Sequence, residues 1–346
     1  MNSSMSSEDA TISVALTTCN GAKYLEEQLD SIRHQTHQPH ELVVGDDAST
    51  DETVELLERF AQRASFPVRI LKNEPRLGVL KNFLHVFNQC QGQYIAYCDQ
   101  DDVWLPIKLE KCSAALIEHN AMLVSHISQV VDFQLRPTGK LIPYGFPLGC
   151  YAPPHFPFCY WSHGHQMVFR RELVEAMNYF QQAKRNNLVH CQNNLDTLIN
   201  VIAGMYGPSV FIPEALVKFR RHEQTVSGCA KENEGERDHE KKLQRKRQDL
   251  EEVVRTLGAL HEYLTTIGAD AGVGPVNRQR YLDFLRNRKL AMSYRLQVYA
   301  GVGLVDRMRR FLSAIMHRAY SRPQHGGVGI RQAAIDVLLL IRSLAS

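Results

Sequence analysis

The strongest constraint on the fold is a regular alternation of strand-like and helix-like segments over the first 127 residues. Short β-rich or apolar runs predict strands, and the segments between them repeat Leu and Ile at the spacing of an amphipathic helix. A Ser49–Glu52 capping box is expected to open the second helix. The expected strands are residues 12–17, 41–45, 68–70 and 93–98, and the expected helices are residues 22–35, 54–60, 79–90 and 106–116. This alternation predicts an α/β fold with a parallel sheet covered by helices on both faces.

Polar residues gather at the carboxyl ends of three expected strands: residues 17–20, the pair Asp46-Asp47, and residues 99–102. Ligands in open α/β sheets bind beyond the carboxyl ends of the strands. A ligand site along this edge is therefore expected. For Asp46-Asp47 two interpretations stay open: recognition of a base or ribose edge, or hydrogen bonding within the turn before Ser49.

The run Asp99-Gln100-Asp101-Asp102 is the clearest chemical signal in the chain. An extended backbone at a strand exit places residues 99 and 101 on one side. Two such carboxylates, with no Lys or Arg near them in the sequence, repel each other unless a cation joins them. Mg²⁺ or Mn²⁺ suits the site, because these ions take one or two carboxylates and keep positions for diphosphate oxygens. The alternative is an acidic helix N-terminus that complements the helix dipole, with Asp102 as the cap.

The remaining sequence divides the chain into three parts. We expect a disordered N-terminus at residues 1–10, a main α/β domain at 11–229 and a helical, basic region at 230–346. Residues 136–165 are rich in Pro, Gly and aromatic residues and predict a long irregular segment, which is more often functional than decorative. Within this segment His163 and His165 flank Gly164, as a site for acceptor or phosphate or as ordinary histidines.

The C-terminal region carries two patterns that each allow two interpretations. Leu243, Leu250, Leu257 and Leu264 recur every seven residues, as in a coiled coil that forms a homodimer or in an amphipathic helix packed on the body. Further on, Leu304, Met308, Leu312 and Ile315 share one helical face, and Arg307, Arg310 and Arg318 lie away from it. Such a helix lies on a membrane or packs in a core with its basic face solvated.

Charge and cysteine usage narrow the class of partner and the compartment. Residues 230–346 hold 21 Lys and Arg against 13 Asp and Glu, a net charge of +8, which leaves −5 for the first 229 residues. The aromatic residues of the basic region have helix-face spacing and not the spacing of a stacking platform, so no nucleic-acid partner is expected. Eight scattered cysteines without a C-x-x-C pair, no signal-peptide core and no long apolar run predict a cytoplasmic protein, with peripheral contact on the inner membrane face as an option.

Four stretches together resemble the inverting family 2 glycosyltransferases of the GT-A fold, especially bacterial rhamnosyltransferase-like members. They are SVALTTCNGAKYLEEQLDSI (13–32), VVGDDASTDET (43–53), RLGVLKNF (76–83) and YIAYCDQDDVWLPIKLE (94–110). Weaker matches follow at 164–173, at Asp196 with Gly207, and at 219–222. The resemblance covers about residues 11–228 and implies a mixed, mostly parallel sheet followed here by the helical region.

The resemblance also implies roles for individual residues. Thr17, Asp46, Asp47, Asp99 and Asp102 would contact the nucleotide sugar, and Asp99, Asp101 and His222 would hold Mg²⁺ or Mn²⁺.

Asp196 aligns with the catalytic base of the family. Many relatives have His before this base and aromatic residues after it, whereas here the run is Leu195-Asp196-Thr197-Leu198. Glu172 and Asp132 therefore remain competitors for the base, and Asp196 has the alternative role of a helix N-cap.

The function implied is inverting transfer of a hexose from a nucleotide-sugar donor to an acceptor hydroxyl. The acceptor would be a bacterial surface glycan or a lipid-linked precursor, in polysaccharide biosynthesis of the cell envelope. The suggested donor is dTDP-rhamnose, and a UDP-hexose or UDP-N-acetylhexosamine is the rival. A different class, a nucleotide-sugar-binding protein that has lost catalysis, is motivated by the altered surroundings of Asp196.

Overall fold

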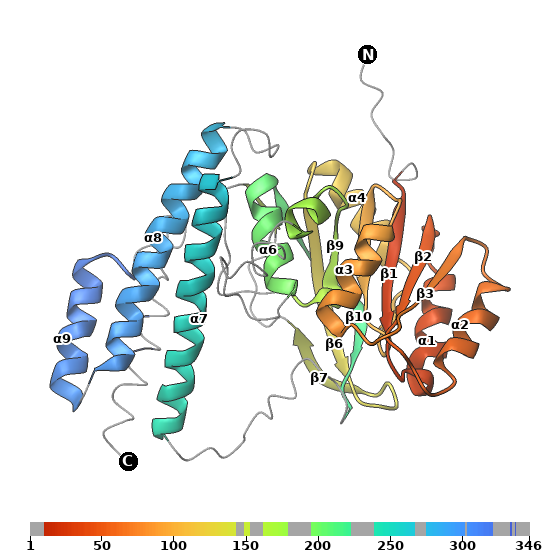
Figure 1. The fold of residues 1–346 in the computed structure, drawn as a ribbon, viewed down its shortest axis with the longest axis horizontal. Coiled ribbons are helices and arrows are strands. Elements are labelled where there is room, and N and C mark those ends of the chain that lie inside the picture. The colour runs from red at the N-terminus through yellow and green to blue at the C-terminus, as the bar shows by residue number, and fades with distance from the viewer. Residues whose placement is uncertain are drawn as a thin grey trace. The chain divides into compact units, whose positions relative to one another are not determined.

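The structure, a computed structural model, describes most of the chain and resolves it into two compact units (Figure 1). The first unit contains a sheet, and its described residues are 10–142, 149–152, 162–178 and 195–222. The second unit is helical, and its described residues are 239–266, 275–301, 303–320, 333 and 336. The predicted boundary at 229/230 and residues 1–9 of the predicted disordered N-terminus lie outside the described residues.

The described part of the first unit builds a ten-stranded sheet around the predicted parallel strands. Those strands lie side by side in the order β3-β2-β1-β4, all parallel. Their bounds are β1 (Ile12–Thr18), β2 (Glu41–Asp46), β3 (Val68–Lys72) and β4 (Tyr94–Cys98). The strands expected from sequence are thus confirmed to within two residues.

Antiparallel strands extend the sheet beyond β4, which makes it mixed. β9 (Met167–Arg170) lies between β4 and β6 (Leu123–Val131) and is antiparallel to both. β10 (Ser209–Arg220) then runs parallel to β6. Three short strands complete the sheet: β5 (Val103–Trp104) and β8 (Gly149–Tyr151) pair with β10, and β7 (Pro137–Ile142) pairs with β6. Because β9 reverses direction, β4, β6 and β10 all end at the same edge.

Helices cover both faces of the parallel strands, as the sequence predicted. Ile12, Val14 and Leu16 of β1 belong to a buried cluster with residues of α1 (Ala22–Arg33), α2 (Thr53–Ala61) and α4 (Lys108–Glu118). On the opposite face α3 (Val79–Gln89) sets the Phe83 ring 3.9 Å from that of Tyr97, centroid to centroid. Burial on both faces explains why these strands are continuous apolar runs.

The capping box expected at the start of α2 is wrong. α2 begins at Thr53, after Glu52. The Ser49 hydroxyl donates instead to Asp46 Oδ1 at 2.5 Å, and the Thr53 N–H donates to Asp51 Oδ1 at 3.1 Å. The buried Asp46 carboxylate takes the hydroxyl that the capping box would need.

The segment 136–165 is more regular than expected in its described part. It contains β7 and β8 and the 3₁₀ turn η2 (Gly164–Gln166). A tight turn starts β7, because Asp132 accepts hydrogen bonds from the backbone N–H groups of Gln134 and Arg136 and so reverses the chain after β6. Residues 143–148 and 153–161 lie outside the described residues.

The second unit consists of helices, as expected. They are α7 (His239–Thr266), α8 (Pro275–Ala300) and α9 (Gly303–Met316). Leu250, Leu257 and Leu264 are buried, and the Arg278 side chain of α8 donates to the carbonyl oxygens of Leu264 and Thr265. Much of the heptad face of α7 is thus covered within the chain; the side chain of Leu243 lies outside the described residues. Among the described helices, none is both long enough and apolar enough to cross a bilayer.

The close approach of α3 to β2 predicts a stability effect at Gly45. A methyl group there would overlap Asn82 Oδ1 and lie 2.6 Å from Val86 Cγ2. Asn82 is held in place because its amide donates to the Gly45 carbonyl oxygen at 2.7 Å. Gly45→Ala should therefore lower the free energy of unfolding by about 1–3 kcal/mol, as overpacked cores do.

Urea unfolding followed by tryptophan fluorescence measures this loss, since Trp104 is buried in the same unit. Val79→Ala, at a half-exposed position of α3, is the control and should change stability by less than about 0.5 kcal/mol. Equal stability of Gly45→Ala and the wild type would contradict this packing.

Candidate functional site

The predicted polar clusters lie together at the carboxyl edge of the sheet. Thr18 is in register with Asp46, and Leu16 with Cys98, so the chain leaves β1, β2 and β4 at the same level. Arg220, the last residue of β10, is in register with Val131, the last residue of β6. Five strand ends therefore deliver side chains to one region.

Asp46 and Asp47 are buried and hydrogen-bonded within the loops they join. Asp46 accepts hydrogen bonds from the Thr18 hydroxyl at 2.9 Å and from the Ser49 N–H at 3.0 Å. Asp47 accepts from the backbone N–H groups of Leu77 at 2.6 Å and Gly78 at 2.8 Å. These contacts agree with the turn interpretation, and nucleotide contact by Asp46, Asp47 and the half-buried Thr17 stays a prediction.

We call residues 99–102 the acidic turn; two neighbouring segments fix its backbone. On one side, the Gln100 amide accepts from the Cys19 N–H at 2.8 Å and donates to the Cys19 carbonyl oxygen at 3.3 Å. On the other side, the backbone N–H of Arg220 donates to Asp102 Oδ1 at 3.0 Å, and its Nε donates to the Asp101 carbonyl oxygen at 2.9 Å. The Arg220 guanidinium is itself held by Glu27 and by the Phe133 carbonyl oxygen.

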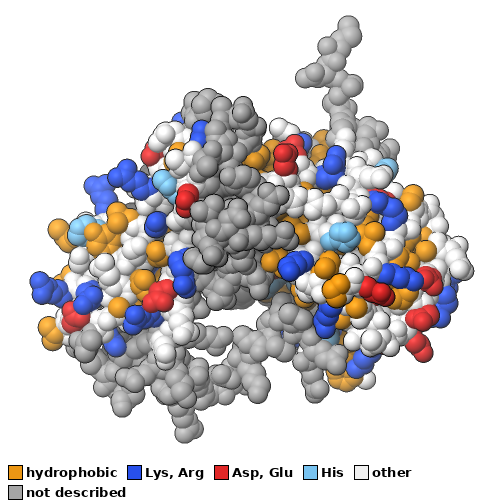
Figure 2. Space-filling model, in the orientation of Figure 1, with side chains coloured by type: hydrophobic (Ala, Val, Ile, Leu, Met, Phe, Trp, Pro, Cys, Tyr) orange, Lys and Arg blue, Asp and Glu red, His pale blue; other side chains and the backbone are white. Residues whose placement is uncertain are grey.

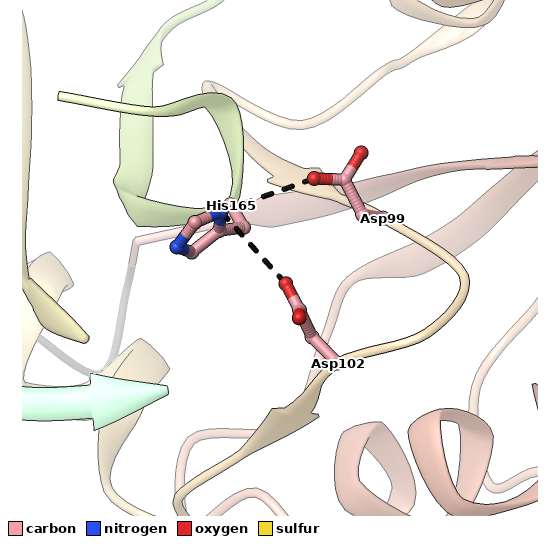
Figure 3. Close-up of side chains that lie close together, drawn as sticks. All are labelled: Asp99, Asp102 and His165. Carbon is pink, nitrogen blue, oxygen red and sulfur yellow. Dashed lines mark ion pairs between the residues drawn. The ribbon is translucent and has the colours of Figure 1, made fainter. Parts of the chain in front are cut away.

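Asp99, Asp102 and His165 converge on one point (Figure 3). His165 Nδ1 lies 3.9 Å from Asp99 Oδ2 and 3.8 Å from Asp102 Oδ2, and one ligand atom of each residue lies within 4.8 Å of the other two. The other ring nitrogen, Nε2, lies 3.0 Å from the Ser128 hydroxyl, and the ring stacks on Phe219 at 4.5 Å between centroids. A histidine oriented by its second nitrogen is the usual arrangement of a metal ligand.

This trio fits a divalent cation on two further grounds. Asp102 is fully buried, and its Oδ2 has no hydrogen-bond partner among the described residues. The separations of 3.9 and 3.8 Å from His165 Nδ1 lie between the roughly 3.0 Å of adjacent and the roughly 4.2 Å of opposite ligands around a six-coordinate ion with bonds of about 2.1 Å. Two carboxylate oxygens with an imidazole nitrogen are a donor set that Mn²⁺ accepts.

The electrostatics of the trio favour cation binding as well. Burial, and then the charge of Asp101, raise the pKa of both Asp99 and Asp102 well above the usual range. Burial likewise lowers the pKa of His165, so the imidazole is neutral and has a lone pair available. A divalent ion would supply the positive charge that this buried group requires in its ionised form.

The structure places the three metal ligands predicted from sequence in two separate groups. Asp99 belongs to the trio, whereas Asp101 and His222 form a separate pair, with Asp101 Oδ2 at 2.8 Å from His222 Nε2. The His222 ring also lies 4.6 Å from the ring of Tyr24. A cation held by Asp99, Asp101 and His222 remains a prediction.

The expectation that the acidic turn has no cationic side chain nearby in sequence is wrong. Lys108, in the first turn of α4, is fully buried, and its charge acts on both Asp99 and Asp102. Its Nζ donates to the His165 carbonyl oxygen at 2.8 Å and lies 3.5 Å from the centre of the Trp104 ring. Burial lowers the pKa of Lys108 to about 8, so this amine compensates the carboxylates only in part.

Asp196 lies in the first turn of α6 (Leu195–Tyr206), and the backbone N–H of Gly164 acts on its carboxylate in the direction that lowers its pKa. Gly164 is the residue before His165, and a Cβ there would overlap the Tyr97 ring. Burial raises the pKa of Asp196 to about 6. The charge of Asp196 also raises the pKa of Tyr97 and of Asp99, one member of the trio.

The two competitors for the catalytic base have other surroundings. Asp132 closes the turn before β7 and accepts from Arg136 Nε at 2.7 Å. Glu172 is exposed in the turn before the helical residues 173–178. By contrast, burial raises the pKa of Asp196 to about 6.

The sequence did not predict the roles of Lys108 and Arg220, and it left the role of His165 undecided. The His163–His165 pair was noted, but nothing local indicates that η2 carries His165 to the acidic turn. Lys108 and Arg220 lie within stretches that resemble the family, and the signal that could have found them is their position beside strand ends rather than their residue type.

The structure defines a fold class, an α/β fold of GT-A type with a mixed, mostly parallel sheet and C-terminal helices. Residues 13–177 match the model of "Glycosyl transferase family 2". This segment contains β1 to β9 and the trio, whereas Asp196 and His222 lie beyond it.

Several known proteins are similar to this chain in sequence or in fold. An uncharacterised protein of Mycobacterium tuberculosis is 34% identical over 217 residues, 61% of this chain and 59% of its own length. A dTDP-rhamnosyl transferase of Shigella flexneri is 32% identical over 131 residues, 36% of this chain and 43% of its own. The chain thus spans about three fifths, or less, of the length of these curated relatives. Among solved structures, S. aureus TarS 1–349 in complex with UDP-GlcNAc has a TM-score of 0.50 at 18% identity, covering 84% of this chain and 83% of that one, which shows a shared fold.

The divided ligand set yields a prediction for cation binding. His165→Gln and Asp102→Asn should each weaken Mn²⁺ binding by more than about tenfold, since even loss of a supporting hydrogen bond costs roughly 10- to 100-fold. His222→Gln is the matched control and should change the affinity far less. Isothermal titration calorimetry with Mn²⁺ measures all three.

The reverse outcome, loss of Mn²⁺ binding in His222→Gln with His165→Gln unaffected, would assign the cation to Asp101 and His222. Circular dichroism checks that each variant is folded.

Proposed function

We propose that this protein is an inverting, metal-dependent glycosyltransferase that moves a hexose from a nucleotide sugar to an acceptor hydroxyl. The observation that carries the proposal is the convergence of Asp99, Asp102 and His165 at the sheet edge, supported by the raised pKa of Asp196, whose charge acts on Asp99. The family match of residues 13–177 supports the same activity.

The chemistry assigns separate roles to these groups. Mn²⁺ or Mg²⁺ bound by the trio would offset the negative charge of the departing nucleoside diphosphate. Asp196 would accept the proton of the acceptor hydroxyl, because a sugar hydroxyl is a poor nucleophile until its proton is removed. A pKa of about 6 suits this role, since the carboxylate is ionised at neutral pH yet remains basic enough to take a proton. A single displacement directed by this base inverts the configuration at the sugar carbon.

The proposal also names a donor and an acceptor. The dTDP-rhamnosyl transferase of Shigella flexneri supports rhamnose from dTDP-rhamnose, and a UDP-hexose or UDP-N-acetylhexosamine is the alternative. The acceptor would be a bacterial surface glycan or its lipid-linked precursor, met in the cytoplasm or at the inner face of the membrane. A panel of these donors, assayed with Mn²⁺ for release of nucleoside diphosphate, identifies the donor and separates an enzyme from a binding-only protein.

Replacement of the base should stop transfer and leave donor binding intact. Asp196→Asn keeps the shape of the side chain and should lower the transfer rate by about 10²- to 10⁴-fold, the usual contribution of a general base. The dissociation constant for the donor, measured by calorimetry with Mn²⁺, should stay within about threefold of the wild-type value. Glu172→Gln is the control and should retain full activity.

The dependence of the wild-type transfer rate on pH tests the same assignment of the base. The pKa of Asp196 is about 6, so the protonated, inactive form accumulates as the pH falls below that value. kcat/KM should therefore fall about tenfold per pH unit below pH 6. Wild-type transfer rates in Asp196→Asn, or a flat profile between pH 5 and 7, would move the base to another residue.

A further inference from the structure

The outward face of α9 exposes several large apolar side chains, which is unusual for a surface helix. Val305 and Met316 expose 82% and 80% of their surface, and Leu312 exposes 58%. Residues 305, 309, 312 and 316 follow the spacing of one helical face, and Ile315 at its margin is 45% exposed. Burial of these side chains is favourable, so their gathering on one helical face indicates an interaction surface.

The opposite face of α9 provides the packing for the helix. Phe311 and Ala314 are buried in a cluster with Ala291 and Val298 of α8. Arg307 Nε donates to the Gly301 carbonyl oxygen at 2.8 Å, and Arg310 Nε pairs with Asp306 at 2.8 Å. The sequence pattern suggested an apolar face through Leu304 and Met308 with Arg307 and Arg310 turned away from the core, whereas in the structure two arginines contact neighbouring groups and apolar residues point outward.

The charge around this face indicates which partner it suits. Arg309 is exposed within the apolar face itself, and Arg318 is exposed just past the helix. Thirteen Lys and Arg but three Asp and Glu follow Asp270, a net charge of +10. A second copy of the chain would bring the same positive charge to the contact and be repelled, whereas an anionic lipid surface is attracted to it. Figure 2 shows hydrophobic and basic side chains next to one another over α9, at the left of the view.

We propose that α9 is a membrane-docking helix, which inserts Val305, Leu312 and Met316 among the lipids of an anionic bilayer while Arg309 and Arg318 contact the lipid phosphates. Apolar insertion combined with electrostatic attraction is the way interfacial helices bind. This surface goes beyond the proposed glycosyl transfer and requires no catalytic activity. It would place the enzyme on the surface where a lipid-linked acceptor is found.

The test is co-sedimentation of the full-length protein with vesicles. The wild type should bind vesicles of phosphatidylcholine with about one third phosphatidylglycerol, and pure phosphatidylcholine far less. The double variant Val305→Asp/Met316→Asp should lower the partition coefficient by roughly tenfold or more. Arg309→Gln should weaken binding to the anionic vesicles alone, and added salt should weaken it further.

Leu141→Asp, at a 48% exposed apolar position of the first unit, is the matched control and should bind as the wild type does. Thermal melts and Mn²⁺ binding check that each variant is folded, independently of transfer activity. Unchanged binding by the double variant would overturn the proposal, as would equal binding to both vesicle types. A dimer that dissociates in the double variant, or tighter binding of RNA than of anionic vesicles, would do the same by assigning this face to another partner.

Discussion

Burial of acidic side chains at the exit of β4 is the constraint on which the site depends. Carboxylates are rarely buried without a compensating charge, because loss of water disfavours their ionised form. Here Asp102 is fully buried, and burial raises the pKa of both Asp99 and Asp102. Lys108 compensates them in part and also fixes the carbonyl oxygen of His165. A cation drawn to this position is the simplest way to satisfy the remaining charge.

The topology of the sheet brings these buried groups together at one place. Parallel strands end at a common edge, and β9 returns antiparallel between β4 and β6, so η2 just before it carries Gly164 and His165 to the acidic turn. Gly164 then lies next to two proposed functional groups, since its N–H acts on the pKa of Asp196 while the next residue faces the acidic turn. Arg220 joins the far end of the sheet to the same turn through Asp101 and Asp102. Proposed cation ligands and proposed base are therefore fixed by neighbouring backbone groups.

Much of this could be read from the sequence, and the part that could not has a physical reason. Local periodicity predicts strands and helices, and strand ends in a parallel sheet predict where Asp46, Asp99 and Asp101 lie. Periodicity does not encode which distant segments pair, so the insertion of β9, and with it the place of His165, was not predictable. The capping box failed because Ser49 found a buried carboxylate in the preceding strand. On α9 two apolar faces compete, and only packing shows that Phe311 lies inward and Val305 outward.

The most direct test of the account is diffraction near the manganese absorption edge, from crystals grown with Mn²⁺ and the nucleoside diphosphate of the identified donor. The account predicts one anomalous peak within coordination distance of Asp99, Asp102 and His165, with the diphosphate oxygens completing the shell. Clear density for the nucleotide, without an anomalous peak at the acidic turn, would contradict it.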